Sequence, residues 1–165
     1  MELLSDFADW AWARHHNALS WYIRPLIIIA FAMAAWNKKL LLTIGLGLFF
    51  PISAIVFPAP EHPKPFITNF LAEERAWIEA LSLWNGIAFV CLVVAFLWLL
   101  AASLWKRSFW LGILVANLGG AAKLVFSLFS WGEPGMTVII PTLFTALVIN
   151  GAALAFWHYR LKDKS

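Results

Sequence analysis

The chain has 165 residues, of which 62% are hydrophobic and only 13% are charged. This composition argues against an ordinary soluble domain and is typical of a membrane protein. The net charge of +3 does not indicate nucleic-acid binding, because most of the basic residues flank apolar runs instead of forming a patch. The single cysteine, Cys91, excludes an internal disulfide and dithiol redox chemistry.

The first segment, residues 1–20, is predicted to be an amphipathic helix lying at a membrane surface. At 100° per residue, one face gathers its apolar residues, namely Leu3, Leu4, Phe7, Trp10, Ala11 and Ala18. Arg14 is the exception, because helical phase places it on this apolar face. There it can bind a lipid phosphate or a protein acid, and Trp10 lies one turn away for a cation–π contact.

Five apolar runs follow, and each is predicted to cross the membrane as a helix. Their expected bounds are 21–36, 39–57, 81–105, 109–131 and 137–159. At about 1.5 Å per residue, these lengths approach or exceed the ~30 Å of a hydrocarbon core. Residues 58–80 lie between the second and third runs and are predicted to form an outer loop followed by a second amphipathic helix. Four prolines between Pro58 and Pro65 exclude a helix at the start of that loop.

The charges between the apolar runs alternate in sign and predict the orientation. One side receives the basic residues Lys38, Lys39, Lys106, Arg107, Arg160, Lys162 and Lys164. The other side receives eight of the nine acids, namely Glu2, Asp6, Asp9, Glu61, Glu73, Glu74, Glu79 and Glu133. By the positive-inside rule, the N-terminus lies outside and the C-terminus lies in the cytoplasm. Short loops and the lack of a mitochondrial-type leader predict the bacterial inner membrane.

The expected fold is therefore a single all-α integral membrane domain over residues 1–165. Five transmembrane helices form one bundle, and one or two amphipathic helices lie on its outer, periplasmic face. This topology gathers almost every chemically useful side chain at the outer face.

Two further ionisable residues occupy positions that simple amphipathicity does not predict. Glu74 lies near the centre of the apolar face of the second amphipathic segment. Lys123 lies within the run 109–131, on the same face as the small residues Gly112, Ala116, Gly119, Gly120 and Ser127. Because small-residue faces favour close helix contact, Lys123 is expected to point into the bundle. Its position is about fifteen residues, or roughly 22 Å, from the cytoplasmic end of that run.

We expect Arg14, Glu74 and Lys123 to converge beneath the outer interface as a binding site, because ionisable groups within a span often mark one. His62 and Glu133 are further candidates for the same site. The simpler alternatives are that Arg14 and Glu74 form a structural ion pair, that Lys123 extends to the headgroups, or that Glu74 faces water.

The histidines are candidates for catalytic roles, but their spacing argues against a metal site. In an enzyme, Glu74 is the candidate general base and His15 or His16 the candidate proton shuttle. Adjacent histidines on a helix point about 100° apart, so one ion cannot easily bind both. A site that combines one of them with His62 and an acid is the only metal alternative, and no metal site is predicted. Nothing in the sequence identifies a cofactor.

Three classes of function remain open at this stage. The first is a non-enzymatic accessory or assembly subunit, or a binder of a lipid or other apolar ligand. The second is a membrane enzyme acting on a lipid or lipid-linked head group in the outer leaflet. A transporter or channel is less favoured, because the charges do not outline a polar path across the membrane. The expected partners are membrane lipids and a larger membrane complex or a second copy of the chain, with no nucleic acid.

In size, number of spans and tryptophan content, the chain is similar to the tryptophan-rich sensory proteins, which bind porphyrins and sterols. That family's signature, Trp-Tyr…Lys-Pro…Trp-x-Pro-Pro, lies in the loop after its first span. Here Trp21-Tyr22-Ile23-Arg24-Pro25 lies at the start of the first span, and the later Trp-Pro-Pro is absent. No site residues are carried over from that family.

Overall fold

A computed structural model describes residues 2–161 of the chain, and all of the regular elements in this range are helical. In chain order they are α1 Glu2–His15, α2 Leu19–Tyr22, α3 Arg24–Trp36, α4 Leu40–Ile52, the 3₁₀ turn η1 Ser53–Ile55, α5 Pro65–Ala80, α6 Leu83–Trp105, α7 Phe109–Trp131, the 3₁₀ turn η2 Pro134–Val138, α8 Ile139–Phe156 and the π-helical turn η3 Trp157–Leu161. The prediction of an all-α protein is confirmed for these residues.

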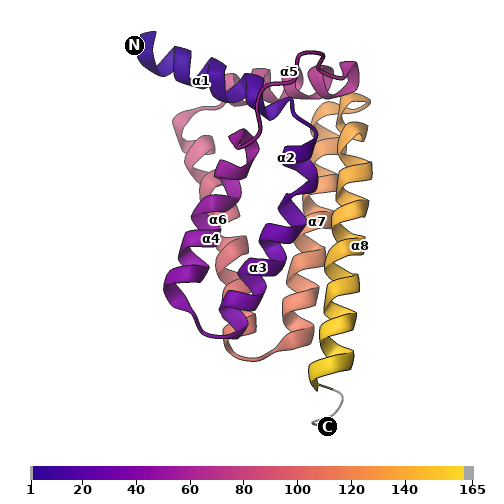
Figure 1. The fold of residues 1–165 in the computed structure, drawn as a ribbon. Helices are drawn as coiled ribbons and strands as arrows, with labels where there is room; N and C mark the ends of the chain where they lie inside the picture. The colour runs from indigo at the N-terminus through magenta and orange to yellow at the C-terminus, as the bar shows by residue number, and fades with distance from the viewer. Residues whose placement is uncertain (1, 162–165) are drawn as a thin grey trace.

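The helices form a bundle that is covered at one end. Helices α3, α4, α6, α7 and α8 run along the length of the molecule, while α1 and α5 lie across one end of it (Figure 1). We call this the covered end. The opposite end, which we call the turn end, holds the tight connections 37–39 and 106–108 (Figure 1).

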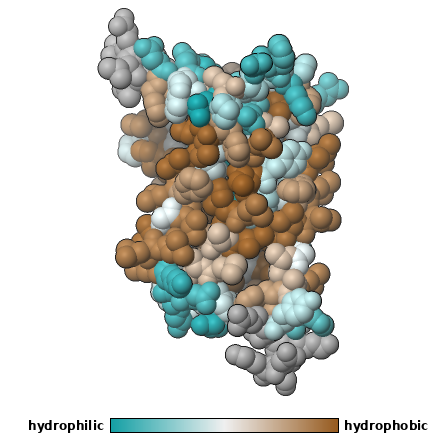
Figure 2. Space-filling model, in the orientation of Figure 1, coloured by the Kyte–Doolittle hydropathy of each residue, from teal (hydrophilic) through white to brown (hydrophobic). Residues whose placement is uncertain are grey.

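Within residues 2–161, four segments are long and apolar enough to cross a membrane. They are Leu19–Trp36, Leu83–Trp105, Phe109–Trp131 and Pro134–Tyr159. The fifth candidate, Leu40–Ile55, forms a shorter apolar helix, so the predicted count of five spans is not confirmed by length alone. Figure 2 shows a broad hydrophobic band between two hydrophilic ends. Many large apolar side chains are exposed on the surface of the chain, and that of Phe129 is 89% exposed. These features are those of a helical membrane protein, because such a surface is compatible with an apolar surrounding.

Small residues bring the long helices into contact. A Cβ added to Gly112 would collide with the side chain of Leu104, and one added to Gly119 would collide with Phe96, so α7 packs closely on α6. On α7 and α8, the amides of Asn117 and Asn150 donate to each other at 3.0 and 2.8 Å. The small-residue face predicted on residues 109–131 is therefore a helix-packing face.

The covered end depends on one especially close backbone approach. A Cβ added to Gly135, in η2, would collide with the backbone carbonyl of Ser127 in α7. Gly135 and Ser127 are both buried, and backbone atoms cannot yield as a flexible side chain can.

We expect Gly135→Ala to destabilise the protein by about 1–3 kcal/mol, because overpacking forces the backbone of α7 and η2 apart. The matched control is Gly151→Ala in α8, where no atom lies within 4 Å of the added methyl group. There, higher helix propensity should leave stability unchanged or raise it slightly. Thermal unfolding of the purified variants checks the difference, and equal midpoints for both variants would show that this contact does not constrain the fold.

Candidate functional site

A continuous layer of aromatic rings lies between α5 and the bundle. His15 lies 6.0 Å from Trp21, Trp21 lies 5.6 Å from Phe70, and Phe70 lies 5.2 Å from Trp131, all between ring centroids. The rings come from four different helices and extend through Trp131 to Trp77 at 6.1 Å. This layer fixes the position of α5 over the bundle, because aromatic pairs combine a large buried area with a preferred geometry.

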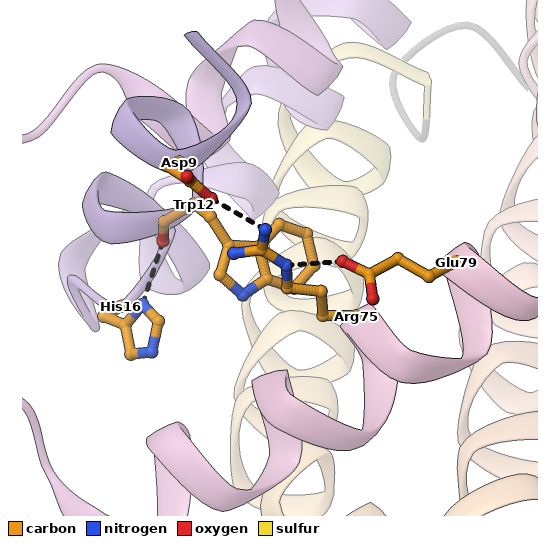
Figure 3. Close-up of polar contacts among 5 residues, drawn as sticks. All are labelled: Asp9, Trp12, His16, Arg75 and Glu79. Atoms are coloured by element: carbon orange, nitrogen blue, oxygen red, sulfur yellow. Dashed lines mark hydrogen bonds and ion pairs between the residues drawn. The ribbon is translucent and has the colours of Figure 1, made fainter. Parts of the chain in front are cut away.

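Arg75 ties α1 to α5 at the surface of the covered end. Its Nη2 donates to Asp9 of α1 at 2.7 Å and its Nε donates to Glu79 at 2.8 Å, and its guanidinium carbon lies 6.0 Å from the ring centroid of Trp12 (Figure 3). These charges are largely exposed, so the ion pairs themselves contribute little free energy. Their role is to fix the approach of the two helices.

Arg14 serves a structural purpose that the sequence does not predict. Its Nε donates to the carbonyl of Ile55 at 2.7 Å, and its Nη2 donates to the carbonyl of Val56 at 3.3 Å. These carbonyls end the α4–η1 segment, where a cation is favourable because the helix dipole is negative. The expected cation–π contact with Trp10 is present at 4.8 Å. No ion pair joins Arg14 to Glu74 within the part of the chain that the structure describes.

His15 is the residue that meets Glu74. Its Nε2 lies 3.9 Å from Oε2 of Glu74, and the two side chains are 14% and 29% exposed. Both line a cavity of about 240 Å³ between α1, η1 and α5, together with Ala11, Trp12, Ala54, Ile55 and Ile78. The two ionisable side chains therefore form the polar part of an otherwise apolar wall beneath α1.

Lys123 extends toward the same region from the inner face of α7. On either side of it in helical phase, Gly119 packs against Phe96 of α6 and Gly120 lies near Thr142 of α8. This arrangement supports the expectation that Lys123 faces the bundle. Its side chain is nevertheless exposed, so it lies beside open space and not in a packed core.

Arg24, at the start of α3, completes what we call the charged cluster, which consists of His15, Arg24, Glu74 and Lys123. The charges of Arg24 and Lys123 act on both His15 and Glu74. Among the described residues no ion pair joins either cation directly to Glu74, so these charges interact over more than a contact distance. Arg24 Nε and His15 Nδ1 are buried and have no hydrogen-bond partner there.

The surroundings shift the pKa values of the two residues that line the cavity. Burial, followed by the charges of Arg24 and Lys123, lowers the pKa of His15 to about 3, while the backbone of Ala54 opposes the change. Burial raises the pKa of Glu74, and the charges of Lys123 and Arg24 limit that rise. His15 is therefore neutral at pH 7, and its contact with Glu74 is not an ion pair.

The other predicted site residues lie away from the charged cluster or bond elsewhere. His16 Nδ1 donates to the carbonyl of Trp12 at 2.9 Å, within its own helix (Figure 3). His62 and Glu133 are exposed in the connections before α5 and after α7. Across the part of the chain that the structure describes, no group of three or more potential ligands is arranged to hold a metal ion. The structure therefore brings together His15, Glu74 and Lys123 of the predicted set.

Arg24 is the member of the charged cluster that sequence reasoning missed. It begins the apolar run 21–36 at the acid-rich end, whereas the positive-inside rule places basic anchors at the other end. This conflict is the sequence signal that distinguishes it from an ordinary anchor.

Comparison with known proteins adds no assignment to this geometry. No protein family model, no curated protein and no solved structure matches the chain. Any functional conclusion must therefore come from the chain's own residues.

The lowered pKa of His15 makes stability depend on pH. The unfolded chain titrates near 6.5 and the folded chain near 3, so the stability due to neutral His15 is present above pH 6.5 and is lost as pH falls toward 3. We expect the wild-type protein to lose about 2 kcal/mol more than His15→Gln between pH 7 and pH 5. Thermal unfolding across this range measures the difference.

The control variant is His62→Gln, which removes an exposed histidine and should follow the wild-type profile. Glu74 has the opposite effect on stability. Because its pKa is raised in the folded state, the folded protein becomes more stable as Glu74 gains a proton at low pH. Matching pH profiles for His15→Gln and the wild type would contradict the burial of His15.

Proposed function

We propose that this chain is a non-enzymatic integral membrane protein that binds the anionic head group of a lipid or other amphiphile beneath α1 and α5. One observation carries this proposal. The charged cluster contains two cations, Arg24 and Lys123, but only one acid, Glu74. Because His15 is neutral at pH 7, the cluster has a net positive charge even with Glu74 ionised.

Uncompensated charge is costly inside a membrane protein. Isolated ions in a medium of low dielectric constant must be paired or neutralised, and ionisable residues within spans commonly line ligand sites. A bound anion would compensate the cluster without requiring either cation to leave the bundle. Arginine and lysine are suited to this role, because both donate several hydrogen bonds to phosphate or carboxylate oxygens.

The surroundings favour an amphiphile over a simple ion. The cavity beneath α1 presents Trp12, Ile55 and Ile78 beside its two ionisable side chains. Two buried N–H donors without partners within the described residues, Arg24 Nε and Trp131 Nε1, lie in the same covered end. An acceptor-rich head group with an apolar tail complements such a mixture of donors and apolar walls.

The proposal includes the five-span topology, with the covered end outside and the turn end in the cytoplasm. In this topology, Leu40–Ile55 is the fifth span. Side chains such as Leu41 and Leu48 are exposed along it, as a lipid-facing helix requires. Lys38, Lys39 and Arg107 at the turn end support the cytoplasmic assignment. We place the protein in a bacterial inner membrane, with membrane lipids as its first partners and a larger complex or a homo-oligomer as further partners.

A membrane enzyme acting on a lipid or lipid-linked head group is the second candidate. The supporting observation is that Glu74, whose pKa is raised by burial, lines a cavity with His15 3.9 Å away. A carboxylate of raised pKa suits a general base. His15 suits a proton shuttle less well, because a pKa of about 3 leaves it without a proton to donate at neutral pH.

The direct test is binding of dodecyl phosphate, compared with the uncharged dodecyl maltoside, to the full purified chain. We expect dodecyl phosphate to raise the unfolding midpoint of the wild-type protein, because a ligand of the folded state stabilises it. Lys123→Gln should weaken binding by roughly 10- to 100-fold, the usual effect of losing a hydrogen bond between charged groups.

Lys64→Gln is the matched control, because it removes an exposed lysine from the covered end outside the charged cluster. It should bind dodecyl phosphate as the wild type does. Equal responses of all three proteins would refute an anion site at the cluster. Native mass spectrometry of the protein extracted with its own lipids then identifies the bound species. If the wild-type protein chemically converts this species and Glu74→Gln does not, the result would favour the second candidate, a membrane enzyme.

A further inference from the structure

A second cavity lies at the turn end, far from the charged cluster along the bundle. It has a volume of about 370 Å³ and lies between α3, α6, α7 and α8. Its lining is almost entirely apolar and includes Ile29, Met33, Ile113 and Ala153. Met33 is exposed, so the cavity is a cleft that opens on the side of the bundle. Its volume is within the range of small-molecule sites.

Aromatic rings line the end of this cleft nearest the turns. Trp36 lies 5.6 Å from Phe156 and 6.2 Å from Phe109, and all three residues line the cleft. These residues lie at the ends of α3, α7 and α8, and Trp36 is of the amphipathic kind that usually marks a membrane interface. The cleft thus runs from the interface into the apolar layer.

Basic residues stand at the mouth of the cleft. The guanidinium carbon of Arg107 lies 5.0 Å from the ring centroid of Trp36, so the 106–108 connection is beside the 37–39 connection. Lys38, Lys39 and Lys106 belong to the same two connections. A positively charged rim therefore borders an apolar cleft.

The backbone conformation of this rim is unusual. Lys38 and Arg107 have φ values of 56° and 60°, and they are the non-glycine residues with positive φ in the described chain. Glycine and asparagine adopt this left-handed region more readily than long side chains do. Both residues belong to the turns that end α3 and α6, where the N–H of Lys39 donates to the carbonyl of Ala34 and the N–H of Ser108 donates to that of Ser103. A long basic side chain occupies each position where such turns usually have glycine.

We propose that this cleft binds one anionic phospholipid of the leaflet at the turn end. One acyl chain occupies the apolar cleft, and the phosphate lies at Arg107 and Lys38. Ordinary topological anchors explain the presence of basic residues at this end but not their position beside an apolar cleft. The inference does not depend on the proposed anion site at the covered end.

The test is native mass spectrometry of the full chain in detergent, titrated with dioleoyl phosphatidylglycerol or dioleoyl phosphatidylcholine. We expect phosphatidylglycerol to be retained in preference to phosphatidylcholine, which has the same acyl chains. The double variant Lys38→Asn/Arg107→Asn should bind phosphatidylglycerol roughly 30-fold more weakly, from the usual contribution of a basic residue near an anionic lipid. It should also unfold at an equal or higher temperature, because asparagine relieves the left-handed strain.

A second variant tests the cleft itself. Ala153→Phe fills it and should reduce phosphatidylglycerol binding while the rim charges remain. The matched control Lys64→Asn removes one lysine from the covered end and should bind as the wild type does. Equal affinity for the two lipids, unchanged binding by the double variant, or unchanged binding by a folded Ala153→Phe would each overturn the proposal.

Discussion

The cost of placing charge inside an apolar layer is the constraint on which the covered end of this protein depends. Arg24 begins α3 and Lys123 lies two turns before the end of α7, so both cations belong to helices that form the bundle. Glu74 must then lie where it can offset them, and α5 carries it across the end of the bundle. The aromatic layer under α5, from Trp21 through Phe70, holds that helix in place. Charge and packing thus stabilise the same arrangement.

The two ends of the molecule use apolar and charged groups in different ways. At the covered end, α1 and α5 enclose a small cavity, and His15 and Glu74 form its polar wall. At the turn end, an apolar cleft opens on the side of the bundle and the basic residues stand at its rim, with Arg107 on Trp36. The packed small-residue contacts of α7 connect the two regions. Both arrangements suit amphiphiles, because each places cations beside apolar surface.

The helices were predictable from the sequence, but the pairing of their charges was not. Long apolar runs and prolines determine where helices begin and end, because backbone groups in an apolar layer must be bonded within the helix. Helical phase predicts that Lys123 faces the bundle, and its neighbours Gly119 and Gly120 pack against α6 and α8. Helical phase could not show that Arg14 meets the carbonyls of Ile55 and Val56, which end a segment about forty residues away. Consequently His15 occupies the place beside Glu74 that phase suggested for Arg14. Arg24 was missed because a basic residue at a helix end resembles an anchor.

The most direct test of this account is a double-mutant cycle between Glu74→Gln and Lys123→Gln, with thermal unfolding as the measurement. If the two cations share one acid, Glu74→Gln should destabilise the wild type clearly, because it leaves both cations uncompensated. The same change should cost less in the Lys123→Gln background, with a coupling free energy of about 1 kcal/mol or more. Additive effects of the two substitutions would contradict the charged cluster and, with it, the functional site that we place beneath α1 and α5.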